Sequence, residues 1–225
     1  SSVEKQNQFV SDASHELRTP ISVIQGYANL LDRWGKNDKG ILEESIEAIK
    51  SESKNMKDLI EELLFLARGD KNTQKVEKEN FMMNELIDEI VKETKLIDDV
   101  HKIENEHNDE FSINADKNLI KEALRIFIDN SIKYTEEGES IRVDSYKKEN
   151  EAVITIADNG TGISKEDLPR IFDRFYRADK SRTKSSGGTG LGLSISKWII
   201  DKHNGTIHVW SEIDIGTIVK ITLPI

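Results

Sequence analysis

The sequence contains no cysteine among its 225 residues. This absence excludes disulfides, cysteine–zinc sites and thiol nucleophiles, and it fits an intracellular setting. The sequence also lacks any apolar run near the roughly 20 residues that a membrane-spanning helix needs. It shows no signal peptide, although it begins with Ser1 rather than Met. We therefore expect no direct membrane contact from this stretch of chain.

Basic side chains are outnumbered by acidic ones. The formal net charge is −10, from 32 Lys and Arg against 42 Asp and Glu, whereas a nonspecific nucleic-acid binder usually carries the opposite sign. We therefore expect no nucleic-acid partner. Residues 170–184 are an exception, with six basic and two acidic side chains. This basic island indicates either a local anionic ligand or a solvated loop.

The first 68 residues are predicted to form two helices joined by a turn at residues 35–40. Apolar and small residues recur at alternating spacings of four and three, which is a heptad seam. The seam positions are Val10, Ser14, Leu17, Ile21, Ile24, Ala28, Leu31, Leu42, Ile46, Ile49, Ser53, Met56, Ile60, Leu63 and Ala67. One helical hairpin buries such seams poorly, so we expect residues 1–68 to form a four-helix bundle in a homodimer.

The remainder is predicted to be a second domain, residues 77–225, after a polar linker at residues 69–76. Helical patterns cover 84–97, 117–134, 164–172 and 191–203. Alternating patterns typical of strands cover 140–147, 151–157, 205–212 and 216–223, with weaker ones near 101–105 and 111–115. This mixture indicates an α+β sandwich.

His15 is the first candidate for chemistry. It falls at a b position beside the seam, so the imidazole is expected to face water, where its neutral form is a nucleophile or proton carrier near pH 7. Glu16 adjoins it and Thr19 lies one turn later on the same face. Pro20 removes a backbone donor and is expected to loosen the helix. Taken alone, a solvated surface histidine is the plainer interpretation.

Two glycine-rich segments are candidates for nucleotide binding. Residues 158–162 (DNGTG) follow a strand, and residues 186–193 (SGGTGLGL) open a helix. Free amides at a helix N-terminus favour phosphate, although neither segment matches the P-loop or the dinucleotide-binding pattern. Asn130 and Lys133, on the helix 117–134, offer an oxygen ligand for Mg²⁺ and a charge for phosphate, or simply stabilise the helix C-terminus.

Together these segments resemble the five motifs of sensor histidine kinases, in the same order and over nearly the whole chain. The matching segments are residues 15–20 (HELRTP, the H box), 125–135 (RIFIDNSIKYT, the N box), 158–162 (the G1 box), 172–177 (FDRFYR, the F box) and 188–193 (GTGLGL, the G2 box). The resemblance implies a dimerisation and phosphotransfer hairpin followed by an ATP-binding domain of the Bergerat fold.

For the hairpin, the resemblance implies that His15 is phosphorylated at Nε2 and that Glu16 is the neighbouring acid or base. Thr19 completes a pattern that the family links to phosphatase activity towards the receiver domain of the partner response regulator. For the second domain, it implies that Asn130 holds Mg²⁺.

The remaining residues that the resemblance implicates bind ATP. Asp158 accepts a hydrogen bond from the adenine amino group, and Thr217 assists it. Residues 173–189 form a mobile lid. The other nucleotide-binding residues implied are Lys133, Tyr134, Gly160, Gly162, Gly188, Thr189, Gly190, Leu191 and Gly192.

Ile126 departs from the family pattern, because many members carry a second Asn there. Related ATPases of the gyrase and chaperone kind place a Glu at this position to activate water, which isoleucine cannot do. A Bergerat-fold ATPase is therefore disfavoured. A dimeric scaffold with a degenerate ATP site is the other alternative, and the intact Asn130 and Asp158 weigh against it.

The sequence thus predicts a histidine kinase core that uses Mg-ATP to phosphorylate His15 and passes the phosphoryl group to an aspartate of a response-regulator receiver. The resemblance implies a cytoplasmic location and a longer parent protein anchored in the cell membrane.

Overall fold

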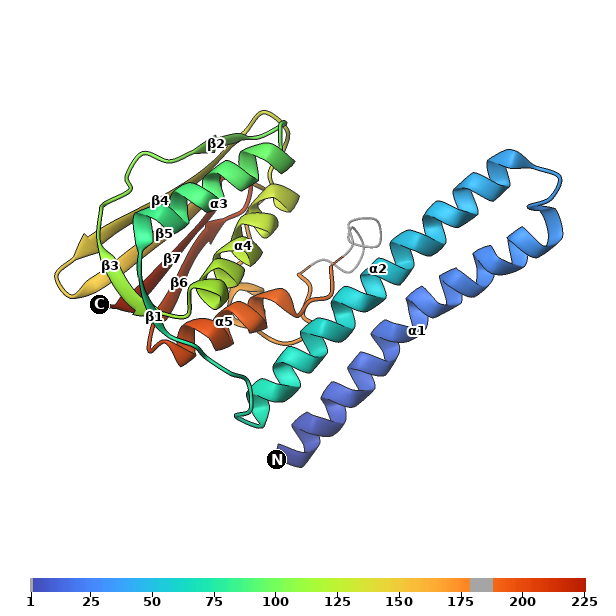
Figure 1. The fold of residues 1–225 in the computed structure, drawn as a ribbon, viewed down its shortest axis with the longest axis horizontal. Helices are drawn as coiled ribbons and strands as arrows, with labels where there is room; N and C mark the ends of the chain where they lie inside the picture. The colour runs from blue at the N-terminus through green and yellow to red at the C-terminus, as the bar shows by residue number, and fades with distance from the viewer. Residues whose placement is uncertain (1, 179–187) are drawn as a thin grey trace. The chain divides into compact units, whose positions relative to one another are not determined.

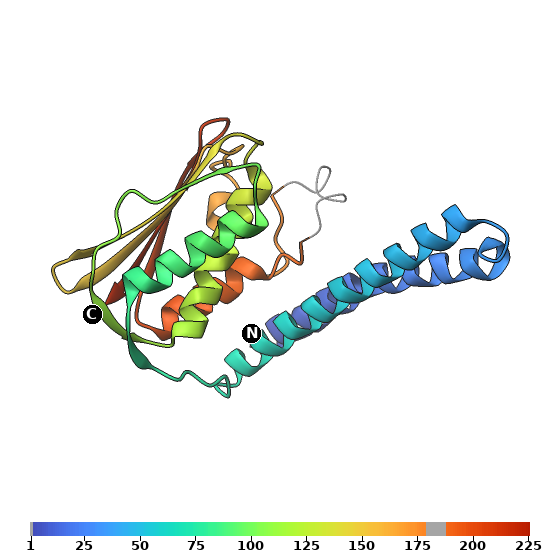
Figure 2. The ribbon, with the colours of Figure 1, turned by 45° about the horizontal axis from the view of Figure 1, so that its top comes forward.

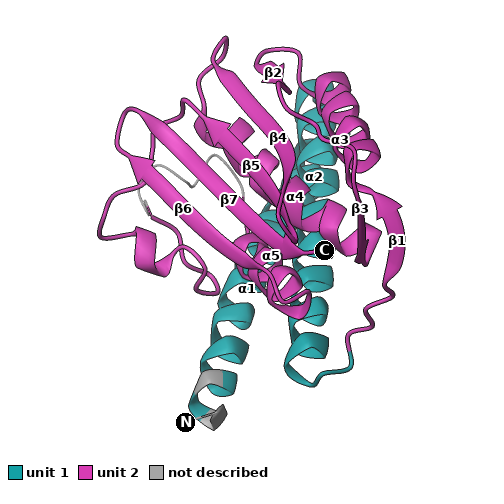
Figure 3. Ribbon diagram, turned by 90° about the vertical axis from the view of Figure 1, so that its left-hand side faces the viewer, with its two compact units in different colours: residues 1–73 teal, residues 74–225 magenta. Residues whose placement is uncertain are grey.

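The chain divides into two compact units, residues 1–73 and residues 74–225 (Figure 3). The structure, a computed structural model, describes residues 2–178 and 188–225. The boundary between the units lies inside the polar segment at 69–76. The first unit is helical, and the second combines helices with a sheet, so an all-α hairpin followed by an α+β domain is confirmed.

The first unit is a hairpin of two long helices, α1 (Ser2–Trp34) and α2 (Lys39–Asp70), which lie side by side in Figures 1 and 2. Asp38 caps α2, because its side chain accepts a hydrogen bond from the Ile41 amide at 3.1 Å. The turn is thus shorter than expected, since α2 begins at Lys39. The helix then continues two residues beyond residue 68.

The hairpin leaves much of its apolar seam uncovered. Val10 and Ile21 on α1 are 58% and 41% exposed, and Ile46 and Ile60 on α2 are 43% and 42% exposed. All four belong to the heptad seam. One hairpin therefore does not bury the seam, as the sequence pattern leads us to expect.

The second unit is built on a five-stranded sheet of order β2-β4-β5-β7-β6, with a separate two-stranded sheet of β1 and β3. In the large sheet β2 runs parallel to β4, and every other neighbouring pair is antiparallel. The helices and strands of the second unit are β1 (Glu79–Met82), α3 (Met83–Ile97), β2 (Lys102–Glu104), β3 (Ser112–Ala115), α4 (Lys117–Tyr134), β4 (Ser140–Lys148), β5 (Glu151–Asp158), η1 (Leu168–Arg170), α5 (Gly192–Lys202), β6 (Thr206–Glu212) and β7 (Gly216–Pro224).

Helices α3, α4 and α5 cover one face of the large sheet (Figures 1 and 2). Their apolar side chains recur at helical spacing, while the strands contribute every second residue to the same core. The core includes the buried residues Leu86, Ile90, Ile120, Leu124, Ile128, Ile141, Val143, Ile154, Ile156, Ile195, Ile199 and Ile221. This packing holds α4 against β4 and β5, and it holds α5 against α4 and β6.

One predicted helix was wrong, and one strand was missed. The helix expected at 164–172 is only a short 3₁₀ turn, Leu168–Arg170. Pro169 has no amide hydrogen to extend a helix, and Ser164 and Asp167 bond to one another locally, with the Ser164 hydroxyl donating to the Asp167 carboxylate at 2.7 Å. Strand β1 was not anticipated, because it is defined by pairing with β3 about thirty residues later.

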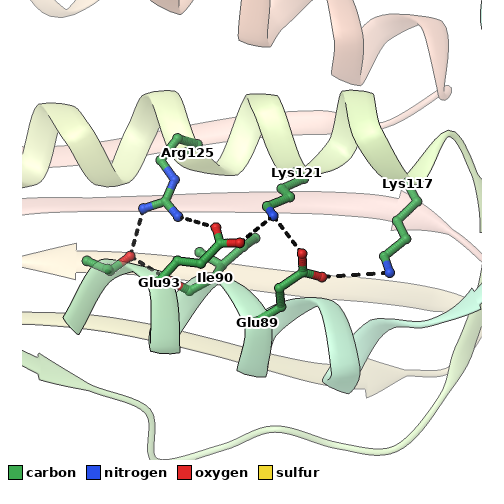
Figure 4. A network of polar contacts seen from close by, with 7 residues as sticks. Glu89, Ile90, Glu93, Lys117, Lys121 and Arg125 are labelled. Carbon is green, nitrogen blue, oxygen red and sulfur yellow. Dashed lines mark hydrogen bonds and ion pairs between the residues drawn. The ribbon is translucent and has the colours of Figure 1, made fainter. Parts of the chain in front are cut away.

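An ion-pair network joins α3 to α4 (Figure 4). Lys121 Nζ lies 2.6 Å from a carboxylate oxygen of Glu89 and 2.8 Å from one of Glu93. Arg125 pairs with Glu93 at 2.9 Å and donates to the Thr94 hydroxyl at 2.9 Å. Hydrogen bonds from Lys121 lower the pKa of both carboxyl groups. The network holds α4 alongside α3.

Within residues 2–178 and 188–225, no helix combines the length and the apolarity that a membrane span requires.

Candidate functional site

His15 lies on α1 with its side chain exposed to solvent. Thr19 is exposed one turn later, while Glu16 is half-buried. Since residues four apart share a helix face, His15 and Thr19 occupy the same accessible surface. The predicted placement of the histidine towards water is confirmed.

Pro20 lies within α1 and does not interrupt it, because the helix is continuous from Ser2 to Trp34. The hydroxyls of Ser14 and Ser22 fold back onto carbonyls one turn earlier, at 2.7 Å and 3.0 Å. The expected loosening is therefore limited to the amide hydrogen bond that Pro20 itself cannot make.

Asp158 lies at the end of β5, where its carboxylate is held by two donors. The Ser131 hydroxyl donates to Oδ2 at 2.7 Å, and the Gly160 amide donates to Oδ1 at 2.9 Å. Ser131 comes from α4 and was not singled out in the sequence. Its contact joins residues 27 positions apart, so only the packing of α4 against β5 could identify it.

The turn after Asp158 needs glycine for steric reasons. A Cβ on Gly160 would lie 2.5 Å from the Tyr134 carbonyl oxygen. Gly162 has φ of +72°, and a Cβ there would lie 2.0 Å from the Glu212 carbonyl oxygen. The backbone of this turn is thereby packed between the end of α4 and the β6–β7 hairpin.

Thr217 on β7 stands opposite Asp158 in the sheet register. Its hydroxyl lies 2.8 Å from the Ser211 hydroxyl, which also accepts the Ile163 amide at 2.7 Å. Asp158 and Thr217 are thus brought together, 59 residues apart in the sequence, by the β5–β7 ladder. Ser211 is a second residue of this region that the sequence did not indicate.

The next part of the site is one face of α4. Ile126, Asn130 and Lys133 recur at spacings of four and three, so they share a face. A Cβ on Gly192 would lie 3.1 Å from Ile126 Cγ2, and one on Gly188 would lie 3.0 Å from Lys133 Nζ. The face that carries Asn130 is therefore turned towards the residues that precede and open α5.

Helix α5 begins without a capping side chain, since its N-cap is the buried Leu191 and no side-chain cap hydrogen bond is present. Before it, Gly190 has φ of +72°, and its carbonyl accepts the Phe175 amide at 2.9 Å. The Leu191 amide donates to the Thr189 hydroxyl at 3.2 Å. Uncapped amides at a helix N-terminus are suited to phosphate oxygens.

Residues 179–184 of the basic island and 179–187 of the predicted lid lie outside the described residues. At the described end, Arg170 stacks on the Tyr176 ring at 4.3 Å and pairs with Asp173 at 3.6 Å. Tyr176 donates a hydrogen bond to Asp167, which raises the pKa of Tyr176. Arg170 of the basic island thus interacts with side chains of its own loop.

A charged pair adjoins the site at the end of α4. His101 Nδ1 lies 2.8 Å from Asp98 Oδ2, and Nε2 lies 2.9 Å from the Thr135 carbonyl oxygen. Burial lowers the pKa of His101, but these two acceptors outweigh it and the net pKa is raised. The Thr135 carbonyl is therefore held by a histidine, next to the Tyr134 carbonyl, which accepts the Thr161 amide at 2.9 Å.

The residues present fit ATP. A carboxylate beside a close-packed glycine turn suits an amino group and a flat ring, and the uncapped start of α5 with Lys133 suits phosphates. For a metal ion, Asn130 offers an amide oxygen. Within 2–178 and 188–225, no group of three His, Asp or Glu is placed to hold a metal.

Two family models match the chain. The one described as "His Kinase A (phospho-acceptor) domain" matches residues 5–72. The one described as "Histidine kinase-, DNA gyrase B-, and HSP90-like ATPase" matches residues 115–225. The first range holds His15, and the second holds Asn130, Asp158 and Thr217.

Among curated proteins, the chain is similar to the signal transduction histidine-protein kinase ArlS of Staphylococcus aureus, with 42% identity over 221 residues. The match covers 98% of this chain and 49% of the relative, so the chain spans about half the length of the curated relatives it matches.

Among solved structures, Acinetobacter baumannii histidine kinase AdeS aligns with a TM-score of 0.72 and 25% identity, over 93% of this chain and 97% of that one. Histidine kinase ThkA, solved in complex with response regulator protein TrrA, aligns with a TM-score of 0.77 over 99% of this chain and 63% of that one. At 23% identity, ThkA shows a shared fold.

Proposed function

This chain belongs to the sensor histidine kinases of two-component systems, and we propose that it transfers the γ-phosphoryl group of ATP to His15. The phosphoryl group then passes to an aspartate of a response-regulator receiver. The observation that carries the proposal is the combination of an exposed His15 on α1 with a pre-arranged Asp158 at the end of β5.

In the proposed complex, Asp158 accepts a hydrogen bond from the adenine amino group, and Thr217 lies beside Asp158 in the sheet. Gly160 and Gly162 let the turn after Asp158 pack closely against the Tyr134 and Glu212 carbonyls, which sets the backbone beside the proposed position of the ring. The phosphates lie against residues 188–192 and Lys133. Asn130 would hold Mg²⁺ through its amide oxygen, and the ion would offset negative charge on the phosphate oxygens.

The transfer is an in-line displacement at the γ-phosphorus. The Nε2 lone pair of neutral His15 forms the new N–P bond, the bond to the β–γ bridging oxygen breaks, and ADP leaves with that electron pair. Glu16 takes the proton from Nδ1, which leaves the imidazole ring of the phosphohistidine uncharged. Thr19, on the same face, would orient water for dephosphorylation of the receiver.

The partners follow from the hairpin. We propose a homodimer through residues 1–68, because the seam residues stay exposed in one copy and burial of about 25 cal/mol per Å² of apolar surface favours association. The receiver docks on the face around His15. We place this chain in the cytoplasm, as part of a longer protein anchored in the cell membrane.

The decisive experiment is incubation of the dimer with γ-labelled ATP and Mg²⁺, followed by acid and base treatment. We expect an acid-labile, base-stable label. It should be lost in His15→Gln, which should still bind ATP, and also in Asn130→Ala. Stable labelling of His15→Gln would show that another residue is the acceptor, and unchanged labelling of Asn130→Ala would remove that residue from the mechanism.

The same experiment separates the alternatives. A Bergerat-fold ATPase would release phosphate continuously without an acceptor, yet Ile126 offers no group to activate water. A degenerate scaffold would bind ATP, as a thermal shift would show, but would leave His15 unlabelled.

A further inference from the structure

We propose that Ser131 is a positioning residue for base recognition, which orients Asp158 towards an amino group and makes the site select adenine over bases without one. The inference rests on the proposed function, because it assumes that the ring of ATP is recognised at Asp158. Ser131 lies one residue after Asn130 and is not among the residues assigned to the site from the sequence.

The first argument is burial. Ser131 is 5% exposed and lies on the core face of α4, one turn after the buried Phe127 and two turns after the buried Leu124. A hydroxyl on such a face costs free energy unless it has a partner. Its partner is Asp158 Oδ2 at 2.7 Å, so the position of Ser131 is explained by that contact.

The second argument is geometry. Asp158 accepts one hydrogen bond on each carboxylate oxygen, from Ser131 on one side and from the Gly160 amide on the other. Two donors on different elements fix both the position of the carboxylate and its rotation about the Cβ–Cγ bond. Each oxygen keeps a lone pair that can accept a further hydrogen bond. The carboxylate is therefore already oriented before the nucleotide arrives.

The third argument is charge. A carboxylate offers hydrogen-bond acceptors only. It can bind the amino group of adenine, but it opposes the carbonyl oxygen that guanine carries at the same ring position. Ser131 therefore supports selection between the two purines as well as affinity.

A buried hydroxyl close by belongs to the same polar region. Thr135 is 8% exposed, and its Oγ1 has no hydrogen-bond partner within the described part of the chain. A Cβ placed on Gly160 would lie 2.9 Å from Asp158 Oδ1 and 3.0 Å from Thr135 Oγ1. The turn at Gly160 thus lies between the oriented carboxylate and a second polar group that is free to bond.

The test compares Ser131→Ala with the wild type, using ATP, GTP and purine riboside triphosphate, which lacks the amino group. We expect Ser131→Ala to weaken ATP binding about tenfold, the lower end for a hydrogen bond to a charged group. Binding of purine riboside triphosphate should stay within about twofold, so the preference for the amino group falls by about the same tenfold. KM for ATP should rise while kcat at saturating ATP is retained.

Two further variants make the test selective. Ser131→Cys preserves the volume with a weaker donor and should give an intermediate effect. Ser196→Ala removes another buried hydroxyl, which donates to the Ala123 carbonyl at 3.2 Å, and should leave base preference unchanged. The proposal is overturned if Ser131→Ala binds ATP as the wild type does, or if it loses ATP and purine riboside triphosphate equally.

The outcome is independent of phosphotransfer. A wild-type protein that binds ATP without labelling His15 would contradict the proposed function, yet the nucleotide preferences of Ser131→Ala would still decide this inference. A wild-type protein that labels His15, with Ser131→Ala showing no change in preference, would contradict only the inference.

Discussion

At the scale of single residues, two histidines of the second unit have pKa values shifted in opposite directions by folding. His203 accepts the Asp116 amide on Nε2 at 3.0 Å and donates from Nδ1 to the Ile199 carbonyl at 2.7 Å, which requires the neutral ring. Burial lowers its pKa, assisted by Lys78, against the opposing effects of Ile199 and Asp116. His101, in contrast, faces two acceptors, and its net pKa is raised.

These histidines predict pH effects of opposite sign. Below about pH 6.5 the unfolded chain protonates His203 more readily than the folded one, so its contribution to stability is lost as the pH falls. His101 contributes fully below that pH, and its contribution is lost as the pH rises through its raised folded pKa. We expect the deficit of His203→Gln relative to the wild type to shrink from pH 8 to pH 5.5, and that of His101→Gln to shrink from pH 6 to pH 9.

Urea unfolding followed by tryptophan fluorescence measures both deficits, and Trp198 lies on α5, whose C-cap is His203. Deficits that do not change with pH would show that neither ring changes its charge on folding.

A second prediction at this scale concerns two glycines with positive φ. Gly138 has φ of +85° and open space around its Cβ position, whereas Gly162 has φ of +72° and a backbone carbonyl 2.0 Å away. Gly138→Ala should therefore cost only the conformational strain of about 1–2 kcal/mol. Gly162→Ala should cost more and should also impair ATP binding, because the turn after Asp158 must move. Equal effects on urea midpoint and ATP affinity would contradict the steric argument.

At the scale of elements, α4 uses three faces. One packs on the sheet through residues such as Leu124 and Ile128, one pairs with α3 through Lys121 and Arg125, and one carries Asn130 towards α5. The rotation of α4 about its axis is thus fixed by contacts on two sides. The placement of Asn130 follows from that rotation.

The α3–α4 network predicts a salt-dependent effect. Lys121→Ala removes the cation shared by Glu89 and Glu93, which leaves two carboxylates close together (Figure 4). We expect a lower urea midpoint, with a deficit that shrinks between 50 mM and 1 M NaCl because the ions screen the repulsion. Lys92→Ala, an exposed lysine on α3, should have little effect at either salt concentration.

At the scale of the whole molecule, the first unit cannot complete its core alone. Val10, Ile21, Ile46 and Ile60 keep between 41% and 58% of their surface exposed in one copy. A stripe of this kind along two helices is typical of a bundle interface. The proposed dimer would remove it from water.

The dimer is tested by placing a charge in the stripe. Ile46→Glu should raise the dimer dissociation constant roughly tenfold or more, because each copy buries a carboxylate in an apolar seam. Glu47→Ala, the next residue and already exposed, should leave the dissociation constant unchanged within error. Sedimentation analysis measures both variants. A monomeric wild type, or an unaffected Ile46→Glu dimer, would reject this interface.

Regular elements and motifs were accessible from the sequence, because their signals repeat over a few residues. The helical pattern over 117–134 located α4, and the alternation in residues 151–157 located β5. Strand β1 escaped because its signal is a pairing with β3, and the helix expected at 164–172 was wrong because Pro169 and local side-chain bonds compete with it.

The sequence by itself determined the order of the elements, the exposed His15 beside an apolar seam, and the residue types of the ATP site. Tertiary structure alone decided which partners meet: Ser131 with Asp158, Asp158 with Thr217, and His203 with Asp116. The physical reason is range. Helix and strand preferences act between neighbours in the chain, whereas the hydrogen bonds that orient Asp158 depend on how α4 packs against β5, and that packing is set by the core of the whole unit.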